Sequence, residues 1–308
     1  MKTTTRKLQE ISGSLLVTLP SEWAQRYRLK KGSEVMITQN DDTTLKISKE
    51  FLYDEIKGES IIKYDSLLLR RFFREYLSSV DFVVVHFQEC DTPKEEIRRF
   101  YDFIRDSMLN VEVIEETKEK MVLQIFRMNE VTIGSCIRRM FYLVKNMIDI
   151  LTSKGDASQI IDLDKTVAKF YYMLVKQTRI FLQQGRYTKA EELTVIEAMD
   201  HRMVAEKIER IGDLVKELAI TSDGKRFDKT LLDFFLFVVS RLDSAFSAFI
   251  KHDFDSALRI WDEQRSVFSR FSRLKEQYAK KKDMKSLELC SYLKNVYEHT
   301  RDIANIVR

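Results

Sequence analysis

The two prolines of this chain constrain its fold more than any other feature, because both lie in its first third. Proline removes a backbone donor and clashes with the preceding helical turn, so it ends or kinks helices. Only Pro20 and Pro93 occur in the 308 residues, and everything after Pro93 is free of this residue. The remaining two thirds of the chain can therefore form long, uninterrupted helices.

Composition predicts a folded, multidomain protein of a reducing compartment. With 44% hydrophobic residues, 308 positions suffice for two or three domains with substantial cores. The cysteines, Cys90, Cys136 and Cys290, are odd in number and widely spaced, which argues against a disulfide framework and a zinc ribbon. We find neither a signal peptide nor a run of about eighteen apolar residues. We therefore expect a cytoplasmic protein without membrane insertion.

The first fifty residues are predicted to form four short strands and one helix. The strands are expected over residues 6–11, 15–19, 34–38 and 44–48. Pro20 can open the helix, which should end before Gly32 with cations in its last turn. Because so few elements cannot bury a core alone, we expect this module, residues 1–50, to dimerise.

Positive charge is concentrated in this module. The chain has a net charge of only +4, yet residues 1–31 carry seven lysines and arginines against two glutamates. The rest of the chain is close to neutral. The distribution, more than the total, favours a basic surface at the N-terminus.

Three runs in this module, G-S-L-L-V-T-L-P-S-E-W, L-K-K-G-S-E-V-M-I and L-K-I-S, resemble the AbrB/MazE/SpoVT family of swapped-hairpin DNA-binding domains. In that family two chains interlace their hairpins and present basic residues to DNA. The resemblance implies a homodimer that binds DNA phosphates through Arg6, Lys7, Arg26, Arg28 and Lys30. The alternative is that these are solvated cations on a module that only dimerises. Some members of the family instead bind a toxin protein, but they normally carry a short tail where this chain has a large body.

Residues 53–128 are predicted to form a small α/β domain. Strands near 61–62, 82–85, 111–114 and 121–125 alternate with helices over 66–79 and 93–109, which gives the order βαβαββ. His86 and Cys90 lie near a strand end, but without a second group of ligands a structural role is favoured over a metal site. We expect this domain to couple the two ends of the chain, with ligand sensing as the weaker alternative.

Six helical stretches follow, in two sets of three. The first set covers 130–153, 157–184 and 188–219, and the second covers 228–251, 254–280 and 283–308. Their short connections predict antiparallel neighbours, and hence tandem three-helix bundles at residues 129–221 and 226–308. The 228–251 helix is apolar on nearly all sides, which favours a central helix shared by both bundles over an exposed groove for a partner.

Two acidic pairs occupy matched positions in the third helix of each set. Glu209 and Asp213 lie one turn apart, and Glu298 and Asp302 repeat this spacing 89 residues later. Like charges at this spacing cost a helix roughly 0.2–0.5 kcal/mol, so a repeated pair indicates a duplicated unit. At about 100° per residue, both pairs fall away from the apolar seam and are expected on the outer surface.

The runs A-E-K-I-E-R-I-G-D-L-V-K-E-L-A and Y-E-H-T-R-D-I-A-N-I-V resemble the two signature helices of the PhoU family, and Asp255-Ser256-Ala257 resembles the start of its middle helix. PhoU proteins are tandem three-helix bundles that regulate phosphate uptake, and their outward E-x-x-x-D pairs can bind iron or zinc clusters. The resemblance, over residues 130–308, implies that Glu209, Asp213, Glu298 and Asp302 are ligands for iron, zinc or another divalent cation.

The middle helices carry only half of the partner acids that the PhoU family usually has. Asp164 is followed four residues later by Ala168, and neither Asp262 nor Glu263 leads to a second acid. Weak binding of a hard divalent cation is one interpretation of the pairs. The alternative is an acidic face, or a docking patch for a basic partner, without any metal.

Taken together, the sequence predicts a multidomain, mainly α-helical, non-enzymatic regulator. We expect a homodimer that binds DNA and regulates transcription of phosphate-uptake genes in response to phosphate. The alternative is an adaptor that docks on the ATP-binding subunit of a phosphate transporter and uses its N-terminal module only to dimerise. The sequence contains no P-loop, no dinucleotide fingerprint and no Ser or Cys nucleophile near a His.

Overall fold

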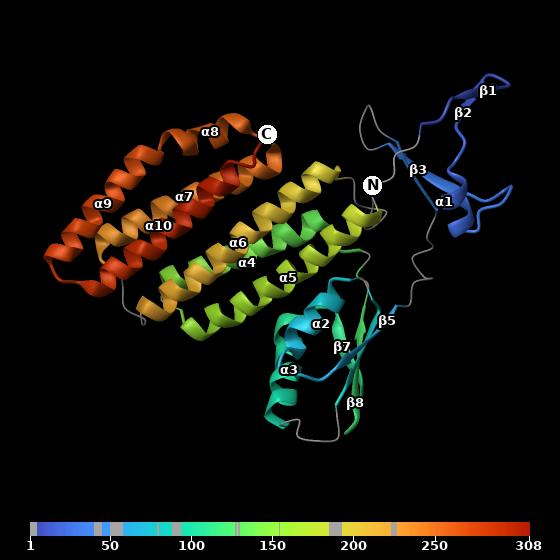
Figure 1. Ribbon diagram of the computed structural model, residues 1–308. Helices are drawn as coiled ribbons and strands as arrows, with labels where there is room; N and C mark the ends of the chain where they lie inside the picture. Colours follow the sequence, from blue (N-terminus) through green and yellow to red (C-terminus); the bar gives the residue numbers. More distant parts are fainter. Residues whose placement is uncertain are drawn as a thin grey trace. The chain divides into compact units, whose positions relative to one another are not determined.

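The chain divides into two units, Met1–Glu55 and Ile56–Arg308, which are described separately below. The computed structural model describes residues 5–39, 45–49, 58–78, 80–87, 94–126, 128, 130–153, 155–184, 193–222 and 227–308 (Figure 1). Cys90, Pro93 and the expected start of the 188–219 helix lie outside these ranges.

The first unit contains two antiparallel hairpins and one short helix. Its elements are β1 (Gln9–Ile11), β2 (Ser14–Leu16), α1 (Ser21–Arg26), β3 (Val35–Gln39) and β4 (Leu45–Lys49). β1 pairs with β2, and β3 pairs with β4. The predicted order of four strands and one helix is therefore confirmed, with the first two strands shorter than expected. Pro20 is the residue before α1, so the helix starts where the proline predicts.

The second unit begins with the predicted βαβαββ domain. Its elements are β5 (Glu59–Lys63), α2 (Leu68–Tyr76), β6 (Phe82–His86), α3 (Lys94–Ser107), β7 (Val111–Glu116) and β8 (Lys120–Ile125). The strands form one sheet in the order β5-β6-β8-β7, in which β5 and β6 are parallel and the other neighbours antiparallel.

Alternation along the strands decides which face of this sheet is covered. Val83, Val85 and Leu123 are fully buried and belong to one core with Phe72 of α2 and Phe100 of α3. The two aromatic rings meet edge to face, with centroids 5.5 Å apart. Both helices therefore pack on the same face of the sheet, and Figure 1 shows them on one side of it.

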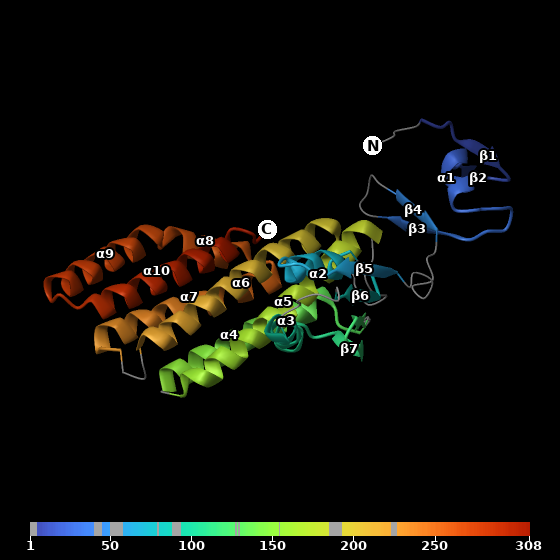
Figure 2. The same cartoon turned by 60° about the horizontal axis from the view of Figure 1, so that its bottom comes forward.

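The rest of the unit is a helical body. Its helices are α4 (Ile133–Ser153), α5 (Ala157–Gln184), α6 (Val195–Ser222), α7 (Lys229–Lys251), α8 (Phe254–Asp262), α9 (Gln264–Lys280) and α10 (Met284–Ala304). The helices run alongside one another, as Figure 2 shows, and α4, α5 and α6 pack together as the first predicted bundle. Contacts between α6 and α10 join this bundle to the second one.

The prediction of a single helix over 254–280 is wrong, because the structure divides this segment into α8 and α9 at Glu263. Arg241 of α7 binds this carboxylate with two nitrogens, at 2.5 and 2.9 Å. Glu263 stays close to helical geometry, with φ −71° and ψ −14°. The division is therefore a shallow interruption and leaves the order of the bundle intact.

Aspartates fix the starts of three helices in the second bundle. Asp228, Asp253 and Asp283 are the N-caps of α7, α8 and α10, and each accepts a backbone hydrogen bond from the third residue that follows. His252 and Lys282, directly before two of these caps, have left-handed backbones at φ 55° and 56°. These local turns end the preceding helices and explain why the chain breaks at the predicted places.

The prediction that α7 is a central helix is confirmed by its aromatic contacts. Phe246 stacks on Phe141 of α4 at 3.8 Å between ring centroids, and Phe249 meets His201 of α6 at 4.9 Å. On another side, Phe234 meets Phe271 of α9 at 4.4 Å. α7 thus contributes to both bundles, which is why nearly all of its faces are apolar. In the described part of the chain, no helix is both long and apolar enough to cross a membrane.

Candidate nucleic-acid interface and acidic pairs

The first hairpin of the N-terminal unit turns within two residues. Ile11 pairs with Ser14, so only Ser12 and Gly13 connect the strands, and both have positive φ, 51° and 81°. Two such residues form the type I′ turn that matches the twist of short antiparallel strands. The predicted turn at Ser12-Gly13-Ser14 is therefore set by local backbone geometry.

The five predicted DNA-binding cations are all exposed, in two short groups. Arg6 and Lys7 precede β1, whereas Arg26, Arg28 and Lys30 lie in the last turn of α1 and just beyond it. Arg28 adopts a left-handed backbone at φ 53°, and the amide of Leu29 donates a hydrogen bond to the carbonyl of Ala24 at 2.9 Å. The chain thereby turns sharply after α1 and spreads consecutive cations over its end.

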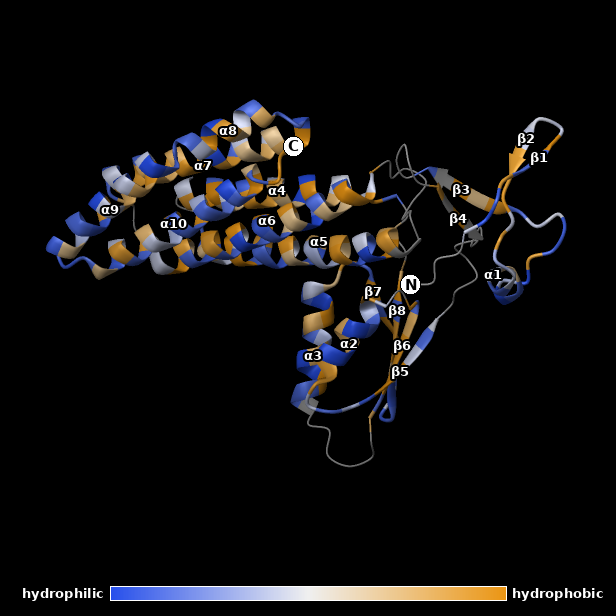
Figure 3. Cartoon of the chain, turned by 45° about the horizontal axis from the view of Figure 1, so that its top comes forward, coloured by the Kyte–Doolittle hydropathy of each residue, from blue (hydrophilic) through white to orange (hydrophobic). Residues whose placement is uncertain are grey.

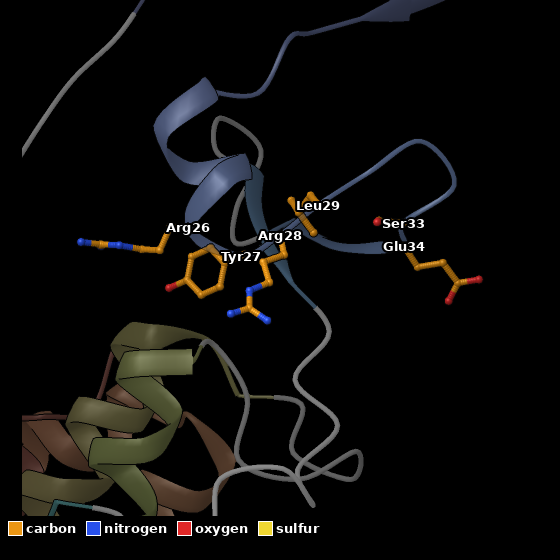
Figure 4. Close-up of a pocket in the computed structure, with 6 residues that line it drawn as sticks. All are labelled: Arg26, Tyr27, Arg28, Leu29, Ser33 and Glu34. Atoms are coloured by element: carbon orange, nitrogen blue, oxygen red, sulfur yellow. The ribbon is translucent and has the colours of Figure 1, made fainter.

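Arg26 and Arg28 line a shallow hollow of about 510 Å³. Figure 4 shows their guanidinium groups on either side of Tyr27, with Ser33 and Glu34 further along the same segment. Guanidinium and hydroxyl donors suit phosphate oxygens, and an aromatic ring between them can contact a sugar or base. The predicted site residues do not include Tyr27 or Ser33, although Tyr27 lies between Arg26 and Arg28 and Ser33 follows Lys30 and Lys31 closely.

The N-terminal unit has no core of its own in the part that the structure describes. None of its residues with a described burial is buried, and five large apolar side chains keep 57–69% of their surface exposed: Leu8, Ile11, Leu15, Ile37 and Leu45. Such density of exposed apolar residues marks an interaction surface. A second copy of the module could bury them, as the predicted homodimer requires.

The acidic pair on α6 faces the neighbouring helix α5. Glu209 keeps only 19% of its side chain exposed, and Asp213 keeps 39%. Arg210 lies between them, 3.8 Å from Glu209 and 3.6 Å from Asp213. Burial raises the pKa of Glu209, and repulsion by Asp213 adds to this effect. The prediction that this pair points outward is therefore only partly right, because α5 covers Glu209.

Lys216 joins the α6 pair to a third carboxylate. Its Nζ donates to Asp164 of α5 at 2.5 Å and to Asp213 at 2.8 Å. Burial alone would lower the pKa of Lys216, but the hydrogen bonds to the two carboxylates outweigh it and raise the pKa. Burial raises the pKa of Asp164, and the bond from Lys216 opposes that rise. The i,i+3 spacing of Asp213 and Lys216 was the sequence signal for this bridge.

The acidic pair on α10 has a looser set of cations. Lys294 lies 3.1 Å from Glu298, and Lys207 of α6 lies 3.4 Å from Asp302. His299 and Arg301 approach Asp302 at 3.8 and 3.6 Å. Glu298 keeps 36% of its side chain exposed and Asp302 keeps 30%. The two acidic pairs are thus not brought together into one site, and each is neutralised by its own cations.

The side chains around these pairs do not fit a resident metal as they are placed. Among the described residues, no three His, Cys, Asp or Glu side chains converge closely enough to hold a metal ion. Lys216 lies where a cation would bridge Asp164 and Asp213. The assignment of Glu209, Asp213, Glu298 and Asp302 as metal ligands stays a prediction.

The α/β domain contacts the body through α5, the helix that carries Asp164. Tyr172 of α5 meets Phe73 of α2 edge to face at 4.7 Å, and Lys169 donates to the carbonyl of Arg105 at the end of α3 at 2.8 Å. Burial raises the pKa of Tyr172, and the charge of Glu209 adds to the rise. The domain contact and the α6 pair therefore share one helix and one set of neighbours.

Two parts of the chain match known families. Residues 9–50 match the family described as antidote-toxin recognition MazE, bacterial antitoxin, and residues 137–221 match the PhoU domain. The first match covers both hairpins and α1, and the second covers most of α4 together with α5 and α6, including the pair on α6. The pair on α10 lies beyond the second match. No curated protein matches the chain.

Proposed function

We propose that this chain, which combines a MazE-type antitoxin domain with a PhoU domain, is a homodimeric transcription regulator of phosphate-uptake genes. The PhoU domain supports a role in the regulation of phosphate homeostasis, and the MazE-type domain supports a DNA-binding or dimerisation module. Both domains come from regulatory families rather than catalytic ones. Binding of operator DNA by a dimer of the N-terminal module is the part that we propose.

The observation that carries the proposal is the composition of the N-terminal surface. Apolar side chains such as Leu15 and Leu45 are exposed, and a second copy would bury them. Exposed cations such as Arg26 and Arg28 surround an open hollow with an aromatic side chain. A dimer would double this basic surface and present it twice, as a two-fold DNA site requires.

The α/β domain offers a route from the PhoU domain towards the N-terminal module. It is anchored on α5 through Tyr172 and Lys169, next to the residues that hold the α6 pair. A change in the packing of α5 against α6 would therefore reach the α/β domain directly. We propose that this contact passes phosphate status, sensed or docked at the body, to the paired N-terminal modules.

The DNA-binding part is tested by gel-shift titration of the full chain on DNA from upstream of phosphate-uptake genes, over a series of salt concentrations. We expect Arg26→Ala/Arg28→Ala to make the slope of log affinity against log salt shallower by roughly 0.9 for each phosphate that the variant leaves without a cation. The matched control is Arg273→Ala/Lys280→Ala, which removes the same charge from exposed positions of α9. Equal slopes in the two double variants, or no binding by the unmodified chain, would contradict the proposal and favour an adaptor.

A further inference from the structure

The sheet of the α/β domain is covered by helices on one face only. Val83, Val85 and Leu123 face α2 and α3, whereas Val84 and Val122 alternate with them and lie outside that core. Figure 3 shows both helices on one side of the strands. Ile61, in register with Val84, keeps 63% of its surface exposed, whereas Val84 on the inner strand keeps 8%. Neither helix therefore covers the second face, which carries apolar side chains at its middle.

Strand register arranges this second face in three rows across the sheet. The apolar row is Ile61, Val84 and Val122, which are direct neighbours on β5, β6 and β8, and Glu115 of β7 continues this row beside Val122. On one side of it lies an acidic row, which consists of Glu59, Phe82, Gln124 and Glu112. On the other side lies a basic row, which consists of Lys63, His86 and Lys120. The face is thus polarised along the strands, from acid through apolar to base.

We propose that two copies of the chain meet through this face, with a two-fold axis along the apolar row. That axis reverses the strand direction, so the acidic row of one copy lies over the basic row of the other. Glu59 of each copy then faces Lys63 of its partner, and the apolar row packs on itself. Isologous contact of this kind uses one self-complementary surface twice.

The charges exclude the other simple arrangement. A two-fold axis along the strands would place each row opposite itself, with Glu59 near Glu112 and Lys63 near Lys120. Like charges in contact disfavour that pairing. The proposed axis brings Glu115 of the two copies near each other, but each is neutralised by Lys120 of its own chain at 2.9 Å. Glu59 and Lys63 are both exposed on the edge strand β5 and are open to a partner. The edge pair therefore decides the orientation.

The surface is too small to hold two free chains together. Three apolar side chains cover much less than the roughly 800 Å² per partner of a stable interface. The contact therefore rests on the proposed N-terminal dimer, which would tether two α/β domains at an effective concentration on the order of millimolar. On this view the face adds a second, weaker contact to the dimer.

The test is cross-linking of the full-length Ile61→Cys variant with a short bismaleimide. Ile61 lies on the proposed axis, so it would face Ile61 of the second copy. Leu69→Cys, on the exposed surface of α2, is the matched control in the same domain. We expect Ile61→Cys to give about fivefold more cross-linked dimer than Leu69→Cys, and Glu59→Lys to remove most of this excess by opposing two lysines.

Exchanging the charges of Glu59 and Lys63 gives the decisive variant. Glu59→Lys combined with Lys63→Glu should restore the cross-linking, because the two charges exchange places. Equal cross-linking at the two cysteines, or no response to Glu59→Lys, would overturn the proposal. Light scattering separates this failure from that of the proposed function. A dimer of twice 36.5 kDa that lacks the Ile61 cross-link refutes only the sheet contact, whereas a monomer refutes both the sheet contact and the proposed homodimer.

Discussion

The two acidic pairs have the same spacing but different surroundings. On α6, Lys216 lies 2.5 Å from Asp164 and 2.8 Å from Asp213, and it ties two helices together. On α10, the cation from the other helix is Lys207, at 3.4 Å from Asp302. Glu209 is also more buried than Glu298, with 19% of its side chain exposed against 36%, whereas Asp213 is somewhat more exposed than Asp302. A repeated motif in the sequence therefore does not give two equivalent sites.

The middle residue of each motif adds to this difference. Arg210, which lies between Glu209 and Asp213, carries a permanent charge. The corresponding residue of the second motif, His299, titrates. Burial lowers the pKa of His299, and Lys207 lowers it further. The α6 pair thus has a permanent cation between its two acids, whereas the α10 pair is neutralised by Lys294, Lys207 and Arg301 around it.

The largest expected effect is on stability, from removal of the bridging lysine. Lys216→Met should lower the free energy of unfolding by about 2–3 kcal/mol, because it leaves the half-buried Asp164 without its main partner. Lys207→Met, the matched change at the α10 pair, should cost less than about 1 kcal/mol because its contact is longer and more exposed. Urea unfolding monitored by circular dichroism measures both.

A second variant separates the effect of the ion pair from that of side-chain packing. Lys216→Met combined with Asp164→Leu removes both charges and should recover most of the stability, since the more exposed Asp213 keeps Arg210 at 3.6 Å as a partner. No recovery, or equal effects of the two lysine variants, would show that the pairs are energetically alike.

Metal affinity gives the next largest contrast. Lys216→Gln removes the cation from among Asp164, Glu209 and Asp213, which do not converge on a metal while Lys216 bridges two of them. Because the carboxylates can then close on a cation, we expect the variant to raise affinity for Mn²⁺ or Zn²⁺ by tenfold or more over the unmodified chain. Lys207→Gln should change the affinity little. Calorimetric titration and elemental analysis of the purified proteins measure the two effects.

Elemental analysis also tests the direct prediction of metal binding. Stoichiometric iron or zinc in the unmodified chain, absent from Glu209→Ala/Asp213→Ala or from Glu298→Ala/Asp302→Ala, would establish these residues as ligands.

The smallest expected effect is on the pH dependence of stability. Because burial raises the pKa of Glu209 in the folded state, the folded chain binds this proton more tightly than the unfolded chain. Ionised Glu209 therefore costs stability at neutral pH, and the cost disappears as pH falls below the unfolded pKa of about 4.3. Glu209→Gln should stabilise the chain slightly at pH 7, by less than about 1 kcal/mol, and this gain should fade as pH falls below the unfolded pKa. Thermal unfolding across this range, beside Glu298→Gln, checks the sign, and a stabilisation that grows towards pH 4 would contradict it.

The contrast between the pairs also shows the limits of angular placement. The apolar seam of α6 correctly put Glu209 off the bundle core, but the residues of one helix do not reveal how far a neighbouring helix extends over its flank. Tyr171 and Tyr172 of α5 lie close enough to Glu209 for its charge to add to the burial that raises their pKa values. The partner acid Asp164 was noted in the sequence, whereas its contact with Lys216, 52 residues away, comes from the packing of α5 on α6.

The sequence by itself determined the order of the elements and most of their ends. Hydrophobic periodicity gave the βαβαββ domain and the helices of the body, and Asp caps and left-handed residues set the breaks at His252-Asp253 and Lys282-Asp283. These are local properties, because propensity, capping and turn geometry depend on residues a few positions apart.

Only the tertiary structure decided which charges meet and which faces are covered. The bridge from Asp164 through Lys216 to Asp213, the interruption of the 254–280 helix where Arg241 holds Glu263, and the open face of the sheet all depend on contacts between distant segments. Sequence spacing cannot give such contacts, since the energy of an ion pair depends on a few ångströms of separation and on the exposure that neighbouring elements leave.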